Sequence, residues 1–103
     1  MKRRARSARK LHPLAQAELL EATRWYANEA GAFWASDFRH EIQRSLRLAV
    51  EHPALASPAV KNTRRLQVHR FPYAVIYRVE GDALRVLAVA HLSRRPGYWA
   101  GRR

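Results

Sequence analysis

The stretch YAVIYRVEGDALRVLAVAHL, residues 73–92, decides the fold because it contains two β-prone segments on either side of a short turn. Its first part, residues 73–79, is rich in β-branched and aromatic residues, which are typical of strands. Its second part, residues 83–92, is almost continuously apolar, as expected for a strand in the middle of a sheet. Gly81 and Asp82 favour a tight hairpin turn. The stretch therefore predicts two adjacent antiparallel strands.

A third strand is expected just before this hairpin. In RRLQVHRF, residues 64–71, Leu66 and Val68 alternate with polar neighbours, and Pro72 follows in a turn. The preceding stretch HPALASPAVKNT, residues 52–63, has several turn-forming residues and no apolar period, so it is expected to be a loop. Three consecutive antiparallel strands result.

The first half of the chain is predicted to form a helical hairpin. A helix over residues 13–30 starts with Pro13 at its first position, and a second helix over residues 33–51 follows Gly31. Helical spacing then gives each helix an apolar stripe that needs a surface to pack against. The stripe residues are Ala15, Leu19, Ala22 and Tyr26 in the first helix, and Trp34, Phe38, Ile42 and Ala49 in the second.

These elements predict one α+β domain over residues 1–103, with the helical hairpin packed on a small antiparallel sheet of three to four strands. The hairpin occupies residues 13–51, the meander of strands residues 64–92, and a basic tail residues 93–103. Residues 1–10 are read as a basic strand at the sheet edge or as a disordered basic arm, and the strand is preferred because it would cover an open edge.

The composition indicates an anionic partner. The chain has 20 Lys and Arg residues against 8 Asp and Glu residues, a formal net charge of +12. Either a nucleic acid or an acidic protein would match this charge. The absence of cysteine excludes disulfides and thiolate zinc sites, and the histidines lack metal-ligand spacing, so no metal and no cofactor are expected. No signal-peptide or membrane-spanning apolar run is present, which favours a cytoplasmic protein without membrane contact.

The order of elements and three sequence segments resemble the RelE/ParE toxins of bacterial toxin–antitoxin pairs. The segments are AELLEATRWY (17–26), RFPYAVIYRV (70–79) and VLAVAHLSRRPGYW (86–99). The resemblance implies one of two targets, since some members cleave messenger RNA on the ribosome and others inhibit DNA gyrase. It also implies an antitoxin that wraps the toxin in a hetero-oligomer. For so basic a chain we expect an acidic antitoxin, bound in a groove between the helical hairpin and the sheet or as a strand added to the sheet edge.

If the chain cleaves RNA, the resemblance assigns the catalytic roles to Arg70, His91 and Tyr98, with Arg94 or Arg95 beside them. Cleavage by the substrate's 2′-hydroxyl needs a base, an acid and cations for the phosphorane charge. His91 is equally well explained as a partly buried histidine bonded to backbone. Strand alternation gives a further expectation. It puts Arg70 on a face with Leu66 and Val68, and His91 on a face with Leu87 and Val89.

A wider set of residues is expected to bind the anion or the target: Arg64, Arg65, Arg94, Arg95 and Trp99. Arginines suit bidentate contact with phosphate or carboxylate. Trp99 and Tyr98 have two possible roles, which are stacking on a nucleic-acid base and packing of the tail over the sheet. For Trp99, packing is preferred.

Three functions follow, in order of preference. The first is a gyrase inhibitor, because the long helical hairpin and the RRPGYW ending are more similar to the ParE branch, and RRLQVHRF contains no glutamate base. The second is a ribosome-dependent endoribonuclease that needs no metal. The third is a nucleic-acid-binding module without enzymatic activity, whose affinity would fall steeply with salt.

Overall fold

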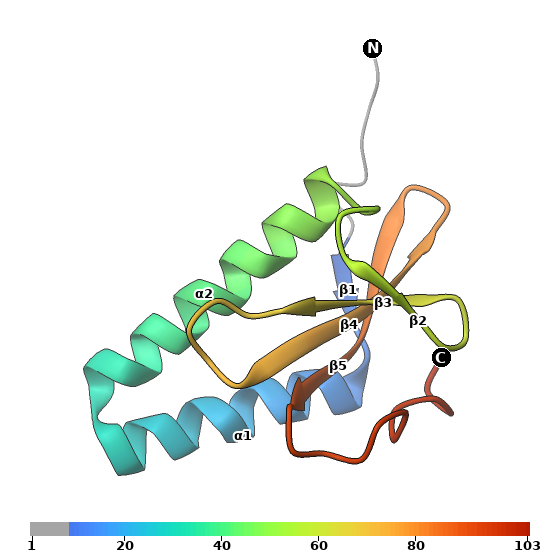
Figure 1. The fold of residues 1–103 in the computed structure, drawn as a ribbon. Helices are drawn as coiled ribbons and strands as arrows, with labels where there is room; N and C mark the ends of the chain where they lie inside the picture. Colours follow the sequence, from blue (N-terminus) through green and yellow to red (C-terminus); the bar gives the residue numbers. More distant parts are fainter. Residues whose placement is uncertain (1–8) are drawn as a thin grey trace.

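The computed structural model describes residues 9–103, in which two helices cover one face of a five-stranded sheet (Figure 1). The expected α+β architecture is therefore confirmed, with more strands than the predicted three to four. In chain order the elements are β1 (Arg9–Leu11), α1 (Pro13–Ala30), α2 (Ala32–Glu51), β2 (Ser57–Ala59), β3 (Thr63–Gln67), β4 (Tyr73–Glu80) and β5 (Ala83–His91).

The sheet has the strand order β1-β5-β4-β3-β2. Strands β2 to β5 pair antiparallel, whereas β1 pairs parallel with β5, so the sheet is mixed and not purely antiparallel as predicted. The expected N-terminal edge strand exists as β1. The part of that predicted segment before Arg9 lies outside the described residues.

Strand β2 lies in the stretch that was predicted to be a loop. The chain reverses between β2 and β3 with positive φ angles at Lys61 and Asn62, and the Thr63 hydroxyl donates a hydrogen bond of 2.6 Å to the Val60 carbonyl oxygen. This turn brings Ser57 opposite Arg65. A three-residue edge strand that contains Pro58 has no periodicity to detect, so sequence patterns miss it.

Local sequence accounts well for the two helices. His12 caps α1, because its Nδ1 atom accepts a hydrogen bond of 3.0 Å from the Leu14 N–H, and Pro13 occupies the first turn. Gly31 has a φ of 99°, which lets α1 end and α2 begin within one residue. The predicted helix over residues 13–30 is confirmed, and the second starts one residue earlier than expected.

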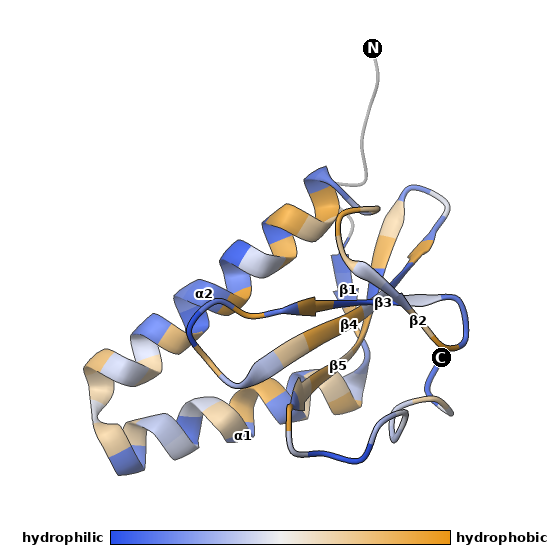
Figure 2. Cartoon of the chain, viewed as in Figure 1, coloured by the Kyte–Doolittle hydropathy of each residue, from blue (hydrophilic) through white to orange (hydrophobic). Residues whose placement is uncertain are grey.

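The hydrophobic core lies between the helices and the sheet, and both helices show alternating hydrophilic and hydrophobic bands in Figure 2. Phe38 is fully buried, with its ring centroid 5.0–5.3 Å from those of Tyr26, Phe71 and Tyr73. The predicted stripe of α1 is confirmed. In α2 the prediction is wrong for Trp34, which remains 43% exposed and packs edge-on against Phe71 of the core and the exposed Phe33.

A β-bulge divides β5 between the two faces of the sheet. Tyr77 pairs with Val86 and Ile76 pairs with Ala88, which leaves Leu87 without a partner. Val86 and Val89 therefore belong to the helix-side core, while Leu87 and Ala88 face the opposite side. The expectation that Leu87 and Val89 share a face is wrong, since the extra residue changes the alternation. We call the side without helices the open face of the sheet.

The described helices include none that is both long enough and apolar enough to cross a membrane.

Candidate functional site

After β5 the C-terminal tail, residues 93–103, turns back across the open face of the sheet (Figure 1). Trp99 anchors it there, since it is only 5% exposed and packs with Ile76, Leu87 and Ala88 in a second apolar cluster. Of the two roles considered for Trp99, packing over the sheet is the one its position satisfies. Strongly hydrophilic residues lie just beyond β5, where the tail begins (Figure 2).

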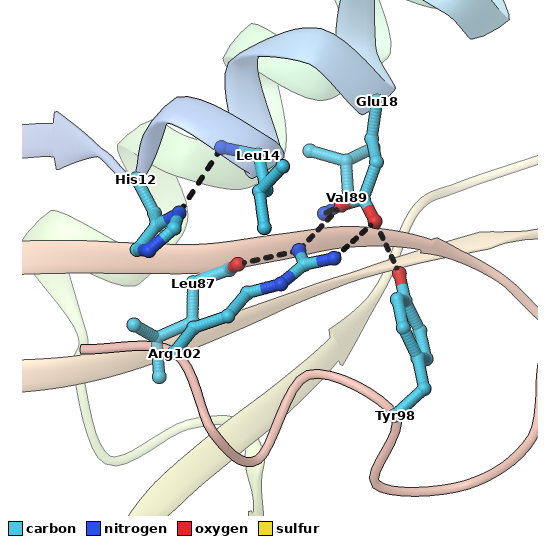
Figure 3. A network of polar contacts seen from close by, with 7 residues as sticks. All are labelled: His12, Leu14, Glu18, Leu87, Val89, Tyr98 and Arg102. Atoms are coloured by element: carbon cyan, nitrogen blue, oxygen red, sulfur yellow. Dashed lines mark hydrogen bonds and ion pairs between the residues drawn. The ribbon is translucent and has the colours of Figure 1, made fainter.

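Glu18 of α1 accepts four hydrogen bonds, three from the tail and one from β5 (Figure 3). Its Oε2 accepts from the Tyr98 hydroxyl at 2.8 Å and from Arg102 Nη2 at 2.9 Å. Its Oε1 accepts from Arg102 Nη1 and from the Val89 N–H, both at 3.0 Å. Arg102 also donates to the Leu87 carbonyl oxygen at 2.9 Å. We call these groups the Glu18 network.

The Glu18 network supplies hydrogen-bond partners to the part of β5 that lies beyond the end of β1. Strand β1 ends at Leu11, opposite Val86, so it does not extend to the next peptide groups of β5. Beyond that point, the Leu87 carbonyl and the Val89 N–H bond to the side chains of Arg102 and Glu18. Backbone groups in such a position need partners, so this exchange ties α1, the bulged strand and the tail into one unit.

The network shifts the pKa values of its members. Burial by itself would raise the pKa of Glu18, but the hydrogen bonds from Arg102, Tyr98 and the Val89 N–H outweigh it and lower that pKa. Burial and the hydrogen bond to Glu18 raise the pKa of Tyr98 to about 12. Glu18 therefore stays ionised and Tyr98 stays neutral over the physiological range.

A hollow of about 270 Å³ opens between the tail and the open face, and we call it the tail pocket. Sheet register explains how it forms, because Arg65 lies opposite Ile76 on β4, and Ala74 of β4 lies opposite Ala90 on β5. The tail closes the other side. The lining residues are Ala59, Val60, Arg65, Ile76, Ala90, His91, Leu92, Arg94, Arg95, Pro96, Gly97, Tyr98 and Trp99.

The charge of the tail pocket is uncompensated. Its three arginines, Arg65, Arg94 and Arg95, are exposed, and none makes an ion pair among residues 9–103. No lining residue is acidic. The sequence has no acidic residue after Asp82, and Glu18 already contacts Arg102. An anion in this pocket would therefore meet guanidinium groups and no acidic lining residue, and of the three arginines Arg94 also borders a neighbouring hollow lined by Glu18 and Glu21.

His91 lies at the boundary between the tail pocket and α1. Its Nδ1 atom accepts a hydrogen bond of 3.0 Å from the Ser93 N–H, and its ring packs edge-on against Tyr73 with centroids 5.0 Å apart. The Nδ1 atom of His91 is thus bonded to backbone, as in one of the two roles considered for this residue. The pairing with Tyr73 places it on the helix side together with Val89, which agrees with that part of the strand alternation.

Two expected site arginines lie elsewhere. Arg70 sits in the turn between β3 and β4 with a φ of 69°, and its Nη2 contacts Asp37 at 2.6 Å and Glu41 at 3.4 Å on α2. Because β3 ends at Gln67, Arg70 lies outside the strand, and the expectation that it shares a strand face with Leu66 and Val68 is wrong. Arg64 is also turned away, since it donates to the carbonyl oxygen of Ala56 at 2.7 Å.

The fold therefore brings together six of the expected site residues and separates two. Arg65, His91, Arg94, Arg95, Tyr98 and Trp99 line the tail pocket, while Arg64 and Arg70 do not. Glu18 and Arg102, which organise the site, are not among the residues expected from the sequence. In the sequence, Glu18 is a polar residue beside an apolar stripe, and Arg102 is one of several C-terminal arginines. Their contact spans 84 positions, so no local pattern indicates it.

A second hollow lies between the two helices. It has about 560 Å³ and is lined by small side chains such as Ala27, Ala35 and Ser36, with Arg39 and Arg47 at its rim. We call it the helix groove. The expected groove between the helical hairpin and the sheet is present as a smaller hollow of about 240 Å³ between α1, the sheet and Arg94, while the core fills most of the space between the helices and the sheet. Within residues 9–103, no three His, Cys, Asp or Glu side chains are grouped to hold a metal ion.

Comparisons with known proteins agree with this geometry. The family model described as ParE toxin of type II toxin–antitoxin system, parDE, matches residues 9–96. A solved structure described as a chromosomal ParDE TA system from P. aeruginosa superposes with a TM-score of 0.71 at 20% identity, covering 82% of this chain and 94% of that one. That likeness shows a common fold. No curated protein sequence matches the chain.

Proposed function

Because the chain belongs to the ParE toxin family of type II toxin–antitoxin systems, we propose that it stops growth by binding DNA gyrase in the cytoplasm. In this proposal the contact surface is the tail pocket and the arginines around it. Family membership also implies an antitoxin partner.

The observation that supports this proposal is the cluster of Arg65, Arg94 and Arg95 around an apolar hollow without any acidic lining residue. Such a surface attracts an anionic partner over a distance and can pair with carboxylates on contact. Binding of this kind needs no reacting groups. It fits a protein that inhibits by occupying its target.

RNA cleavage is supported less well by the geometry. It requires Arg70, His91 and Tyr98 to act on one phosphate, but the Arg70 guanidinium contacts Asp37 and Glu41 on α2. The Tyr98 hydroxyl donates a hydrogen bond to Glu18, and a pKa of about 12 makes Tyr98 a poor acid near neutral pH. His91 keeps its Nε2 atom without a hydrogen-bond partner among the described residues, but it would have to act without the other two groups.

For the antitoxin, we propose an acidic amphipathic helix laid in the helix groove. The small side chains of Ala27, Ala35 and Ser36 allow close approach, and Arg39 and Arg47 at the rim match acidic residues of the partner. In this arrangement the antitoxin does not need the tail pocket. Affinity measurements with the product of the adjacent reading frame test this, and an unchanged affinity of the Arg39→Glu, Arg47→Glu double variant would contradict the placement.

The target is tested by asking which process stops first. After induced expression, we expect filamentation and DNA damage while translation continues, and we expect the purified chain to inhibit supercoiling by gyrase holoenzyme. Rapid arrest of translation with messages cut at codon boundaries would instead show ribosome-dependent cleavage. Normal growth, together with salt-sensitive binding to any nucleic acid, would indicate the simple binding module.

A further inference from the structure

We propose that the tail pocket binds an acidic segment of the target protein, with one aliphatic side chain in the hollow and carboxylates on Arg65, Arg94 and Arg95. This inference rests on the proposed function, and it concerns what the target presents. It assigns the contact to polypeptide and not to the DNA that a gyrase complex also carries.

The size and lining of the pocket fit a side chain. A volume of about 270 Å³ is slightly below the range of roughly 300–1,000 Å³ that is usual for whole small-molecule ligands. The interior is formed mainly by apolar groups, among them Ile76, Ala90 and Pro96. Burial of an aliphatic side chain against such groups is favourable, whereas a free phosphate would gain nothing from them.

The rim of the pocket offers both apolar contacts and charged contacts, which a segment with aliphatic and acidic residues needs. Val60 is 60% exposed and Leu92 is 41% exposed, so apolar surface continues from the hollow to the outside. Arg65, Arg94 and Arg95 line the same hollow, and each has a planar fork of donors that can hold a carboxylate. A partner segment that carries both acidic and aliphatic residues would match this combination of charged and apolar surface.

Base stacking, which single-stranded nucleic acids require, has little surface available here. Trp99 is only 5% exposed, because it is packed in the second apolar cluster. The Tyr98 ring is covered by the Arg94 guanidinium, whose carbon lies 3.8 Å from the ring centroid, and Arg102 lies 5.1 Å from the same centroid. Both aromatic residues of the pocket are therefore occupied within the protein itself.

The pocket is also formed before any partner arrives. The Glu18 network fixes Tyr98 and Arg102, and Trp99 fixes the segment between them. The cost of ordering the tail is therefore met during folding and not during binding. A preformed hollow of this kind favours a side chain that inserts as an anchor.

The test uses gyrase holoenzyme and three toxin variants at exposed positions of the rim: Arg65→Glu, Arg95→Glu and Val60→Asp. Arg24→Glu on α1 is the matched control for the two arginine variants, because Arg24 is exposed, lines none of the hollows described above and gives the same change of charge as they do. Each rim variant is expected to raise the concentration that half-inhibits supercoiling by about tenfold, and the control by less than about twofold. Equal effects of rim and control variants would overturn the inference.

Binding probes separate the two classes of partner. A fluorescent decapeptide of alternating Glu and Leu is compared with its Gln and Leu analogue and with single- and double-stranded DNA decamers. We expect the acidic peptide to bind wild type most tightly and the three rim variants to lose that binding. Tighter binding of either DNA, reduced by the same variants, would assign the pocket to nucleic acid and overturn the inference.

Failure of the proposed function is recognised separately. If wild type does not inhibit gyrase, the proposed target is wrong, while the peptide and DNA probes still decide what chemistry the pocket takes. If the rim variants inhibit gyrase normally but lose antitoxin affinity, the pocket belongs to the antitoxin and the inference is overturned.

Discussion

The two faces of the sheet are covered by different kinds of contact. On the helix side, α1 and α2 bury a large apolar core in which aromatic rings such as Phe38 and Phe71 pack together. On the open face, a short tail without regular secondary structure is held by one tryptophan and by the charged Glu18 network. The first kind of closure is cooperative with the whole fold, whereas the second can open locally.

The largest expected effect tests the helix-side core. Phe38→Ala removes a fully buried ring from a cluster of three other aromatic residues, which costs about 4 kcal/mol of unfolding free energy. In a domain of this size that lowers the melting temperature by roughly 20 °C. Thermal unfolding followed by circular dichroism measures it, with Phe38→Leu as the milder control. A loss below about 1 kcal/mol would show that the faces do not differ as described.

The next effect tests the open face. Trp99→Ala removes the apolar anchor of the tail, but the sheet and helices keep their own core. We expect a loss of about 3 kcal/mol and fast amide exchange in residues 93–103, while β4 and β5 stay protected. Hydrogen exchange with mass spectrometry measures this. Uniform loss of protection over the whole chain would mean that the tail is part of the cooperative core.

A smaller loss of unfolding free energy is expected when the Glu18 network, which also holds the tail, is weakened. Glu18→Gln weakens the hydrogen bonds to Arg102 and Tyr98 and should cost about 2 kcal/mol near neutral pH. Glu21→Gln, also on α1 and exposed, is the control. Denaturant unfolding at several pH values provides the measurement.

The same network predicts a pH dependence with a definite sign. The pKa of Glu18 is lower in the folded protein, so its contribution is complete above the ordinary glutamate pKa of about 4.3. It is lost as the pH falls through the lowered pKa. Wild type should therefore lose stability in acid more steeply than Glu18→Gln, and parallel curves would contradict the role of the network.

The smallest effect is expected at Arg70. Its guanidinium is partly exposed, and its contacts with Asp37 and Glu41 are screened by salt. Arg70→Ala should leave the melting temperature almost unchanged, and any small decrease should vanish at high salt. Toxicity should also persist, because Arg70 does not line the tail pocket. Loss of toxicity in a stably folded Arg70→Ala protein would favour the catalytic hypothesis.

Much of this fold could be predicted from local sequence. The stripe from Ala15 to Tyr26, the Gly81-Asp82 turn and the apolar strand that follows this turn can be predicted from period, turn chemistry and β propensity. The structure confirms them, with the strand ending one residue before the predicted Leu92. The departures have nonlocal causes. The bulge at Leu87 depends on pairing with β4, and β2 depends on the turn at Lys61 and Asn62.

The candidate site was predictable in composition but not in geometry. The tail residues Arg94, Arg95, Tyr98 and Trp99 could be proposed because cationic and aromatic side chains are adjacent in the chain. The role of Glu18 could not, since nothing near it in sequence indicates a partner 84 positions away.

By itself, the sequence determined the helices, the central strands, the positive charge and the resemblance to a toxin family, because these depend on neighbours in the chain or on sums over it. Only the tertiary structure decided which arginines are paired and which remain available. Arg70 and Arg102 meet carboxylates from distant helices, whereas Arg65, Arg94 and Arg95 meet none in the described chain. The energy of a charge depends on its distance to other charges in space, and folding sets that distance.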